Sequence, residues 1–228
     1  VAFEGVGHAP TLVVDDQQTG HRWTFEHITM NLRRPGAGGL ALSVGADTEQ
    51  PWLLRASIGP QADGVRTVDV MADRVSTKDI MIAMRMADSH YDVDLPVSGR
   101  LRGEIGRDGL PTYLTGKVQI DAGTIVDRKV PDFPMSVDRI DINVDWDASR
   151  RVLLAPFQAQ SGGDRFTLLA LLGPPSDAVP DWQFGLSGGT MLFPGEKERA
   201  EAPLIFTRIA VLVRFDTPGR RILVAQGG

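Results

Sequence analysis

The chain contains no cysteine in its 228 residues. Disulfide scaffolds, thiolate metal sites and cysteine nucleophiles are therefore excluded. The absence does not fix the compartment, because a chain without cysteine suits an oxidising and a reducing environment equally well.

The chain also lacks a net positive charge and long apolar runs. The formal net charge is −5, whereas a nucleic-acid surface needs a positive field that replaces counterions. The longest purely apolar run, Leu168 to Leu172, is far shorter than the roughly 20 residues that a helix needs to span a bilayer. These features argue against a nucleic-acid partner, and any membrane anchor is expected to lie outside this stretch.

Turn residues, in contrast, are abundant. The chain has 25 glycines and 15 prolines, and 42% of its residues are hydrophobic. That hydrophobic content is sufficient for a core, while glycine and proline favour tight turns. The composition therefore predicts many short strands joined by turns.

The clearest strand pattern runs from Ile140 to Asp147, where every even position is apolar and every odd position is polar. A period of two places the apolar side chains on one face of a strand. The same pattern recurs from Ile209 to Asp216 and from Leu114 to Ile120. Weaker candidates are residues 23–32, 40–44, 52–58, 66–70, 97–105, 152–160, 165–171 and 182–186. Their spacing predicts an antiparallel meander.

One segment departs from alternation. Ser76 to Asp79 is similar to a capping box, and the apolar stretch from Ile80 to Met86 follows it. This order predicts one short helix near 77–87. Met81, Met84 and Met86 lie on it, and packing against the sheet is favoured over contact with lipid.

An internal duplication is the most informative feature of the sequence. Pro134 to Ile140 aligns with Pro203 to Ile209 at an offset of 69 residues. The segments 150–154 and 220–224 also match, as do 123–126 and 189–192. Repeats of this kind stack their sheets into one continuous apolar face.

The duplication, and the repeat pattern that continues to the end of the sequence, suggest that the chain is part of a longer protein. We expect residues 1–228 to belong to a longer repetitive β-protein. Within it, residues 1–90 form a first repeat with the helix, and residues 91–228 contain two related repeats at about 123–163 and 189–228.

The order of these features resembles a known family. Leu12-Val13-Val14-Asp15 is followed by the aromatic strand Trp23-Thr24-Phe25, a short helix and the segment Leu95 to Leu101. Gly116-Lys117-Val118, Ala122 to Ile125 and the Ile-x-Ile-x-Val-x-Trp-Asp strand come next. The whole is similar to the periplasmic repeat region of the AsmA-like proteins, close to the YhdP and TamB branch, which are bridge-like lipid transfer proteins.

The resemblance implies a fold and a function. The fold is mainly β: an elongated antiparallel sheet, curved or folded over into a repeating β-groove. The function is non-catalytic binding and transfer of phospholipid in the bacterial envelope, by a periplasmic part of a protein anchored in the inner membrane. It implies no cofactor and no catalytic residue, and other envelope proteins are possible partners.

The residues expected to line the groove alternate on the two long duplicated strands. They are Ile140, Ile142, Val144, Trp146, Ile209, Val211, Val213 and Phe215. The residues alone leave open whether this set lines an accessible groove or fills a closed sandwich core. The resemblance favours the groove.

Two other functions are weighed against lipid transfer. One is an assembly scaffold that guides outer-membrane proteins along exposed edge strands. The other is a carbohydrate-active enzyme, which needs two converging carboxylates that no spacing here indicates. The acidic positions Asp141, Asn143, Asp145 and Asp147 are similar to a calcium loop, but they lack its central glycine and closing glutamate. They are expected to form a solvated strand face.

Overall fold

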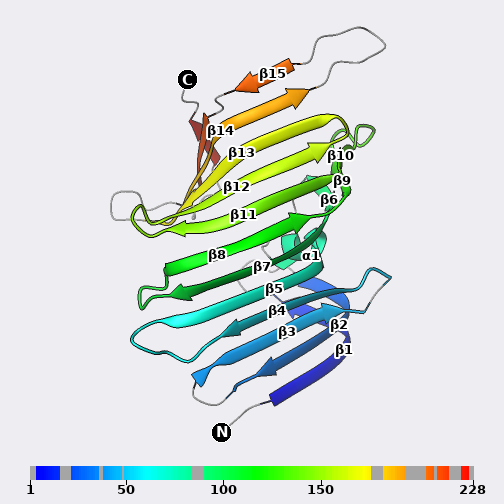
Figure 1. Ribbon diagram of the computed structural model, residues 1–228. Helices are drawn as coiled ribbons and strands as arrows, with labels where there is room; N and C mark the ends of the chain where they lie inside the picture. The colour runs from blue at the N-terminus through cyan, green and yellow to red at the C-terminus, as the bar shows by residue number, and fades with distance from the viewer. Residues whose placement is uncertain are drawn as a thin grey trace.

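The computed structural model contains one large antiparallel sheet, with a smaller sheet and a helix beside it (Figure 1). The structure describes residues 4–15, 22–35, 38–47, 49–83, 90–175, 182–193, 204–207, 210–215 and 222–225. Side chains are described for residues 27–35, 38–47, 49–81, 90–175 and 183–189.

The main sheet has 14 strands, and their order follows the sequence with two interruptions. The strands are β1 (Glu4–Asp15), β2 (Arg22–Arg33), β3 (Leu40–Ala46), β4 (Trp52–Ile58), β5 (Arg66–Ser76), β7 (Pro96–Ile105), β8 (Pro111–Ile120), β11 (Arg139–Asp147), β12 (Val152–Ser161), β13 (Asp164–Gly173), β14 (Trp182–Phe193), β15 (Leu204–Thr207), β16 (Ala210–Phe215) and β17 (Ile222–Ala225). Among the strands that the structure describes, no pairing joins β1 to β17, so the sheet is open. The prediction of a mainly β, antiparallel meander is confirmed.

Two insertions leave the main sheet and pair with each other. The first contains α1 (Thr77–Ala83) and β6 (Tyr91–Asp94), and the second contains β9 (Gly123–Asp127) and β10 (Met135–Val137). The three strands form a small sheet in the order β10-β9-β6. We call α1 together with this small sheet the cap.

The predicted short helix is confirmed as α1. The hydroxyl oxygen of Ser76 accepts a hydrogen bond from the Asp79 backbone N–H at 3.3 Å, which caps the first turn. The Thr77 hydroxyl donates to the Val93 carbonyl and accepts from the Leu95 N–H at 2.9 Å, so the helix is fixed to β6 and to the residue between β6 and β7. Met84 and Met86 lie outside the described residues.

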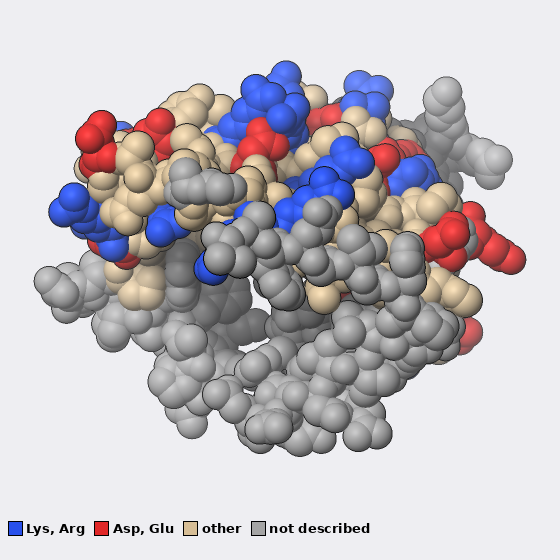
Figure 2. All heavy atoms as spheres, turned by 90° about the horizontal axis from the view of Figure 1, so that it is seen from below, with Lys and Arg blue, Asp and Glu red and all other residues tan. Residues whose placement is uncertain are grey.

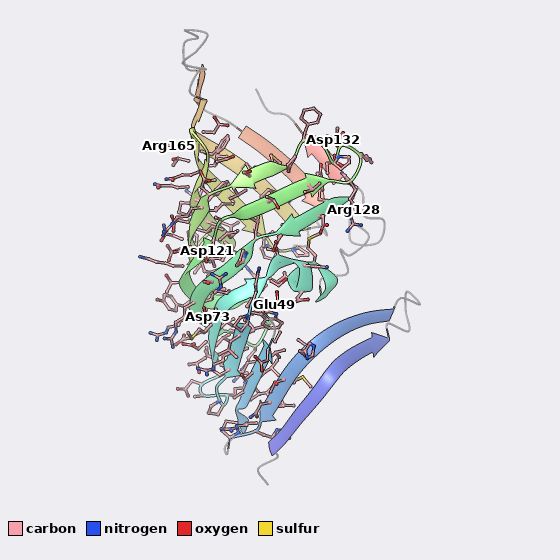
Figure 3. All side chains as sticks on the ribbon, turned by 90° about the vertical axis from the view of Figure 1, so that its right-hand side faces the viewer. Glu49, Asp73, Asp121, Arg128, Asp132 and Arg165 are labelled. Carbon is pink, nitrogen blue, oxygen red and sulfur yellow. The ribbon has the colours of Figure 1, made fainter. Side chains whose placement is uncertain are left out.

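The main sheet is curved, and the cap lies on its concave side (Figure 3). In this view β1 and β2 bend toward the side on which α1 and the cap residues Arg128 and Asp132 lie. Asp73 and Arg165 lie on the opposite side. We call the side that carries the cap the inner face, and the other side the outer face.

The described chain has few fully covered side chains. Six apolar residues are buried, namely Ile28, Ala46, Val75, Leu95, Val144 and Leu168. The accessible surface of 15652 Å² for a 24.7 kDa chain is about one and a half times the roughly 10,000 Å² expected for a globular protein of this mass. An open sheet agrees with this excess, because in the described part of the chain the cap covers only part of one face of the sheet.

Candidate functional site: the inner apolar face

The register of the main sheet gathers apolar residues into continuous rows. Directly opposite residues of an antiparallel pair lie on the same face, so a row can be followed from strand to strand. The longest described row crosses nine strands, from β2 to β13: Met30, Val44, Leu54, Ala72, Gly99, Val118, Ile142, Phe157 and Leu168. At about 4.8 Å per strand it extends for roughly 38 Å, and no polar residue interrupts it.

Three parallel rows widen this surface. The first is Leu32, Leu42, Ala56, Val70, Leu101, Gly116 and Val144. The second is Leu40, Ile58, Val68, Gly103 and Leu114. The third is Val75, Val97, Ile120, Ile140, Ala159 and Phe166.

All four rows lie on the inner face. Asp73 and Arg165 are on the outer side (Figure 3), and their chain neighbours Ala72 and Phe166 therefore point to the inner side, because successive side chains of a strand alternate. The apolar rows and the cap thus share the concave side of the sheet.

The inner face is neither sealed nor fully open to water. Val144 and Leu168 are 7% and 6% exposed, whereas Met30, Leu40 and Ile58 are 43%, 39% and 36% exposed. Val75 and Gly103 are also buried, and the other row members have intermediate exposure. A sandwich core would cover almost all of them, so the described geometry favours an accessible apolar surface over a closed core.

Glycines allow the sheet to curve at its centre. A Cβ added to Gly99 would lie 2.5 Å from the Lys117 carbonyl oxygen, and one added to Gly116 would meet the Arg100 carbonyl oxygen and lie 2.6 Å from Leu101 Cδ2. Only glycine accommodates such close approach of two strands. These glycines lie on the concave side, where curvature crowds the backbone.

The structure places half of the eight predicted groove residues with their side chains. Ile140, Ile142 and Trp146 are half-buried on β11, and Val144 beside them is buried. In β16 the backbone positions of Val211, Val213 and Phe215 pair with Leu186, Phe184 and Trp182, but their side chains lie outside the description, as does all of Ile209. The two predicted strands are thus separate parts of one sheet.

Sequence reasoning missed the larger part of the inner face, on β2 to β8. The signal was present as alternation, in the clear pattern from Leu114 to Ile120 that contains Val118 and in the weaker strand candidate that contains Leu54. What the sequence does not contain is the register that aligns them with Ile142.

A polar contact joins the helix of the cap to the inner face. Burial raises the pKa of the Asp79 carboxyl above its ordinary value, while hydrogen bonds from Trp52 and Ser76 and the charge of Lys78 act in the opposite direction. Trp52 stands opposite Ala46 on an inner-face position of β4. The Asp79 carboxylate therefore ties the cap helix to the sheet.

Carboxylates of the outer face are paired with arginine side chains. Asp69 accepts hydrogen bonds from Arg100 at 2.8 Å and Arg102 at 3.0 Å, and the Arg100 bond is the main cause of its lowered pKa. Arg139 likewise binds Asp141 at 2.7 Å and lowers its pKa. Asp69 thus forms ion pairs across β5 and β7, and Asp141 forms one along β11.

The remaining carboxylates of the acidic strand are also engaged. Asp145 accepts from the Thr115 hydroxyl at 2.8 Å. Asp147 closes the following turn by accepting from Ser149 and from the Arg150 N–H, which lowers its pKa. Within the described ranges no group of three His, Cys, Asp or Glu residues is arranged to hold a metal ion.

Comparisons with other proteins do not assign the chain to a family. Protein-family models, curated proteins and solved structures give no match. In the described part of the chain, no helix has the length and apolarity needed to cross a membrane.

Proposed function

We propose that this chain is a non-catalytic lipid-binding and transfer segment of a bacterial envelope protein, and that it holds phospholipid acyl chains against the inner apolar face. The observation that carries the proposal is the nine-strand row from Met30 to Leu168, which is unbroken by polar residues and only partly covered. The periplasmic location and an anchor in the inner membrane are part of the proposal through the resemblance to AsmA-like proteins.

The energetics of lipid movement suit such a surface. Each CH₂ group moved from an apolar phase into water costs about 0.8 kcal/mol, so a chain of ~15 groups costs roughly 12 kcal/mol. A continuous apolar lining removes most of this barrier without any chemical step. No titratable side chain needs to act in transfer, which agrees with the ion-paired state of the outer-face carboxylates.

The size of the face also fits. One leaflet of the hydrocarbon core is about 15 Å thick, and the row of roughly 38 Å is more than twice as long. An acyl chain lying across the strands would therefore contact several strands, and the next chain could follow in line.

Tryptophan fluorescence offers a direct test, because Trp146 lies on the inner face. The other three tryptophans are replaced by phenylalanine, and the protein is mixed with phospholipid carrying brominated acyl chains. Strong quenching of Trp146 is expected. In the matched reporter, Trp146 is also replaced by phenylalanine and Tyr113→Trp places the fluorophore opposite Glu104 on the outer face, where quenching should be weak.

A pair of neighbouring substitutions tests the same face by affinity. Leu54 belongs to the inner row, whereas Leu53 faces outward opposite Asp73. Leu54→Asn places an unpaired amide against the acyl chain, which costs about 1–3 kcal/mol of binding free energy. Lipid retention should therefore fall about tenfold. Leu53→Asn should leave retention unchanged. Equal effects of the two variants, or equal quenching of the two reporters, would refute the proposal.

An assembly scaffold for outer-membrane proteins is the alternative. The twelve-residue strand β1 ends the described sheet order, and long edge strands accept further strands. This function predicts binding of extended outer-membrane-protein peptides that neither Leu54→Asn nor brominated lipid affects.

A further inference from the structure

The outer face gathers cations that are scattered in the sequence. Arg55, Met71, Arg100 and Lys117 stand directly opposite one another on β4, β5, β7 and β8. The three cations are far apart along the chain, so only the register brings them into one row. At about 4.8 Å per strand the row extends for roughly 14 Å.

Two hollows follow this row. The first has a volume of about 550 Å³ and lies over β2 to β7, and the second has a volume of about 500 Å³ and lies over β7 to β11. Arg100 lines both, so they form one depression, which we call the outer trough. It lies on the side of the sheet opposite to the apolar rows.

The outer trough is positive in an acidic protein. Its lining contains five cations and two carboxylates, a balance of +3, while the whole chain carries −5. The cations are Arg33, Arg55, Arg100, Lys117 and Arg139, and the carboxylates are Asp69 and Asp141. Figure 2 shows Lys and Arg gathered over the upper side of the view, which is the outer face, with acidic residues among them.

Two of these cations are not neutralised locally. Asp69 is shared by Arg100 and Arg102, and Asp141 is bound by Arg139. The exposed side chains of Arg55 and Lys117 have no carboxylate partner in the described part of the chain. Lys117 also stands opposite Arg100, and like charges in directly opposite positions are unfavourable. An anion bound in the trough would relieve this repulsion.

The uncharged lining indicates the kind of anion. Asn31 Oδ1 is buried without a hydrogen-bond partner among the described residues, and it needs a donor. Phosphodiester oxygens offer none, whereas a polypeptide offers backbone N–H groups together with carboxylates that arginine binds through two hydrogen bonds. Met71, 40% exposed between Arg55 and Arg100, adds an adaptable apolar contact.

We propose that the outer trough binds an extended acidic segment of a partner protein. At about 3.3 Å per residue, four or five extended residues cover the row from Arg55 to Lys117. Their carboxylates would lie over the cations, and about three further residues would carry the backbone to Asn31, which stands two strands beyond Arg55 in the same row. This site is independent of the lipid proposal, because it uses the other face of the sheet.

Fluorescence anisotropy tests the proposal on the intact chain. The probe is a labelled peptide of alternating Glu and Ala, and the reference peptide has Lys in place of Glu. We expect saturable binding of the Glu peptide that weakens with rising salt, and no binding of the Lys peptide. Lys117→Glu should weaken the Glu peptide at least tenfold, and Arg55→Glu provides a second variant if the first fails to fold.

Arg165→Glu is the matched control. Arg165 is exposed on the outer face of β13, lies outside both hollows and has no carboxylate partner among the described residues. Its reversal should change binding less than twofold. Failure of the Glu peptide to bind, equal losses from Lys117→Glu and Arg165→Glu, or binding of anionic phospholipid vesicles in place of the peptide would each overturn the proposal.

Discussion

Replacing Gly116 by alanine tests the curvature that makes the inner face concave. In an ordinary strand this change stabilises the protein by roughly 0.5–1 kcal/mol, because alanine has less freedom to lose on folding. Here the new Cβ would meet the Arg100 carbonyl oxygen and lie 2.6 Å from Leu101 Cδ2 and 2.9 Å from Leu101 Cα. The backbones of β7 and β8 would have to separate, so the sign of the effect should reverse.

The size of the effect follows from the crowding. Overpacking of this kind costs about 1–3 kcal/mol, and each kcal/mol lowers the midpoint of thermal unfolding of a domain of this size by about 2–4 °C. We therefore expect Gly116→Ala to lower the midpoint by about 2–12 °C. Circular dichroism in the β region, recorded during heating, measures it.

Gly173 provides the matched control. It lies at the end of β13, and a Cβ added there would have no neighbour closer than 3.7 Å. Gly173→Ala should leave the midpoint unchanged or raise it by a few degrees, about the effect of reduced freedom in the unfolded chain. A midpoint for Gly116→Ala that is equal to or above that of Gly173→Ala would refute the close approach of β7 and β8.

Three further predictions concern the cap and the outer face. Burial raises the pKa of the Asp79 carboxyl in the folded state, so the folded chain binds a proton at Asp79 more tightly than the unfolded chain does. The free energy of unfolding in urea should therefore rise as the pH falls toward that pKa. Asp79→Asn should stabilise the protein at neutral pH and remove this pH dependence. The pKa of Asp69 is lowered from 3.8, chiefly by Arg100. The carboxylate therefore contributes to the free energy of unfolding above pH 3.8, and this contribution is lost as the pH falls through the lower pKa of the folded state. The difference in stability between Asp69→Asn and the parent should disappear in acid. Ser76→Ala removes the cap of α1 and should cost about 1 kcal/mol in the same unfolding assay, whereas Ser76→Asp should retain most of the stability.

The sequence predicted most of the main sheet because its strands carry their own signal. The strand expected at 52–58 is found at Trp52–Ile58, and the one expected at 140–147 is found at Arg139–Asp147. Strict alternation with turn residues between strands specifies such elements locally. Errors occur where irregular backbone extends a strand: β5 continues from Val70 to Ser76 through a register shift that the pattern does not show.

The small sheet and the outer trough were not predicted, and the reason is the same for both. Strand β6 pairs with β9 although β7 and β8 lie between them in the sequence. The cations of the trough come together only through the pairing of four strands. The alternation in a single sequence shows which residues share a face of a strand, but it does not show which strand, tens of residues away, pairs with it. The candidate site on β11 was therefore visible, whereas its continuation onto β2 to β8 was not.

The neighbour-to-neighbour order of the main sheet also bears on how the protein unfolds and grows. Strand contacts in this sheet are made chiefly with the strands on either side, so its stability accumulates step by step, as in a linear array. Such an array loses strands from its ends before its middle, and cooperativity weakens as it lengthens. Gain or loss of a hairpin would change the reach of the array without requiring a new architecture.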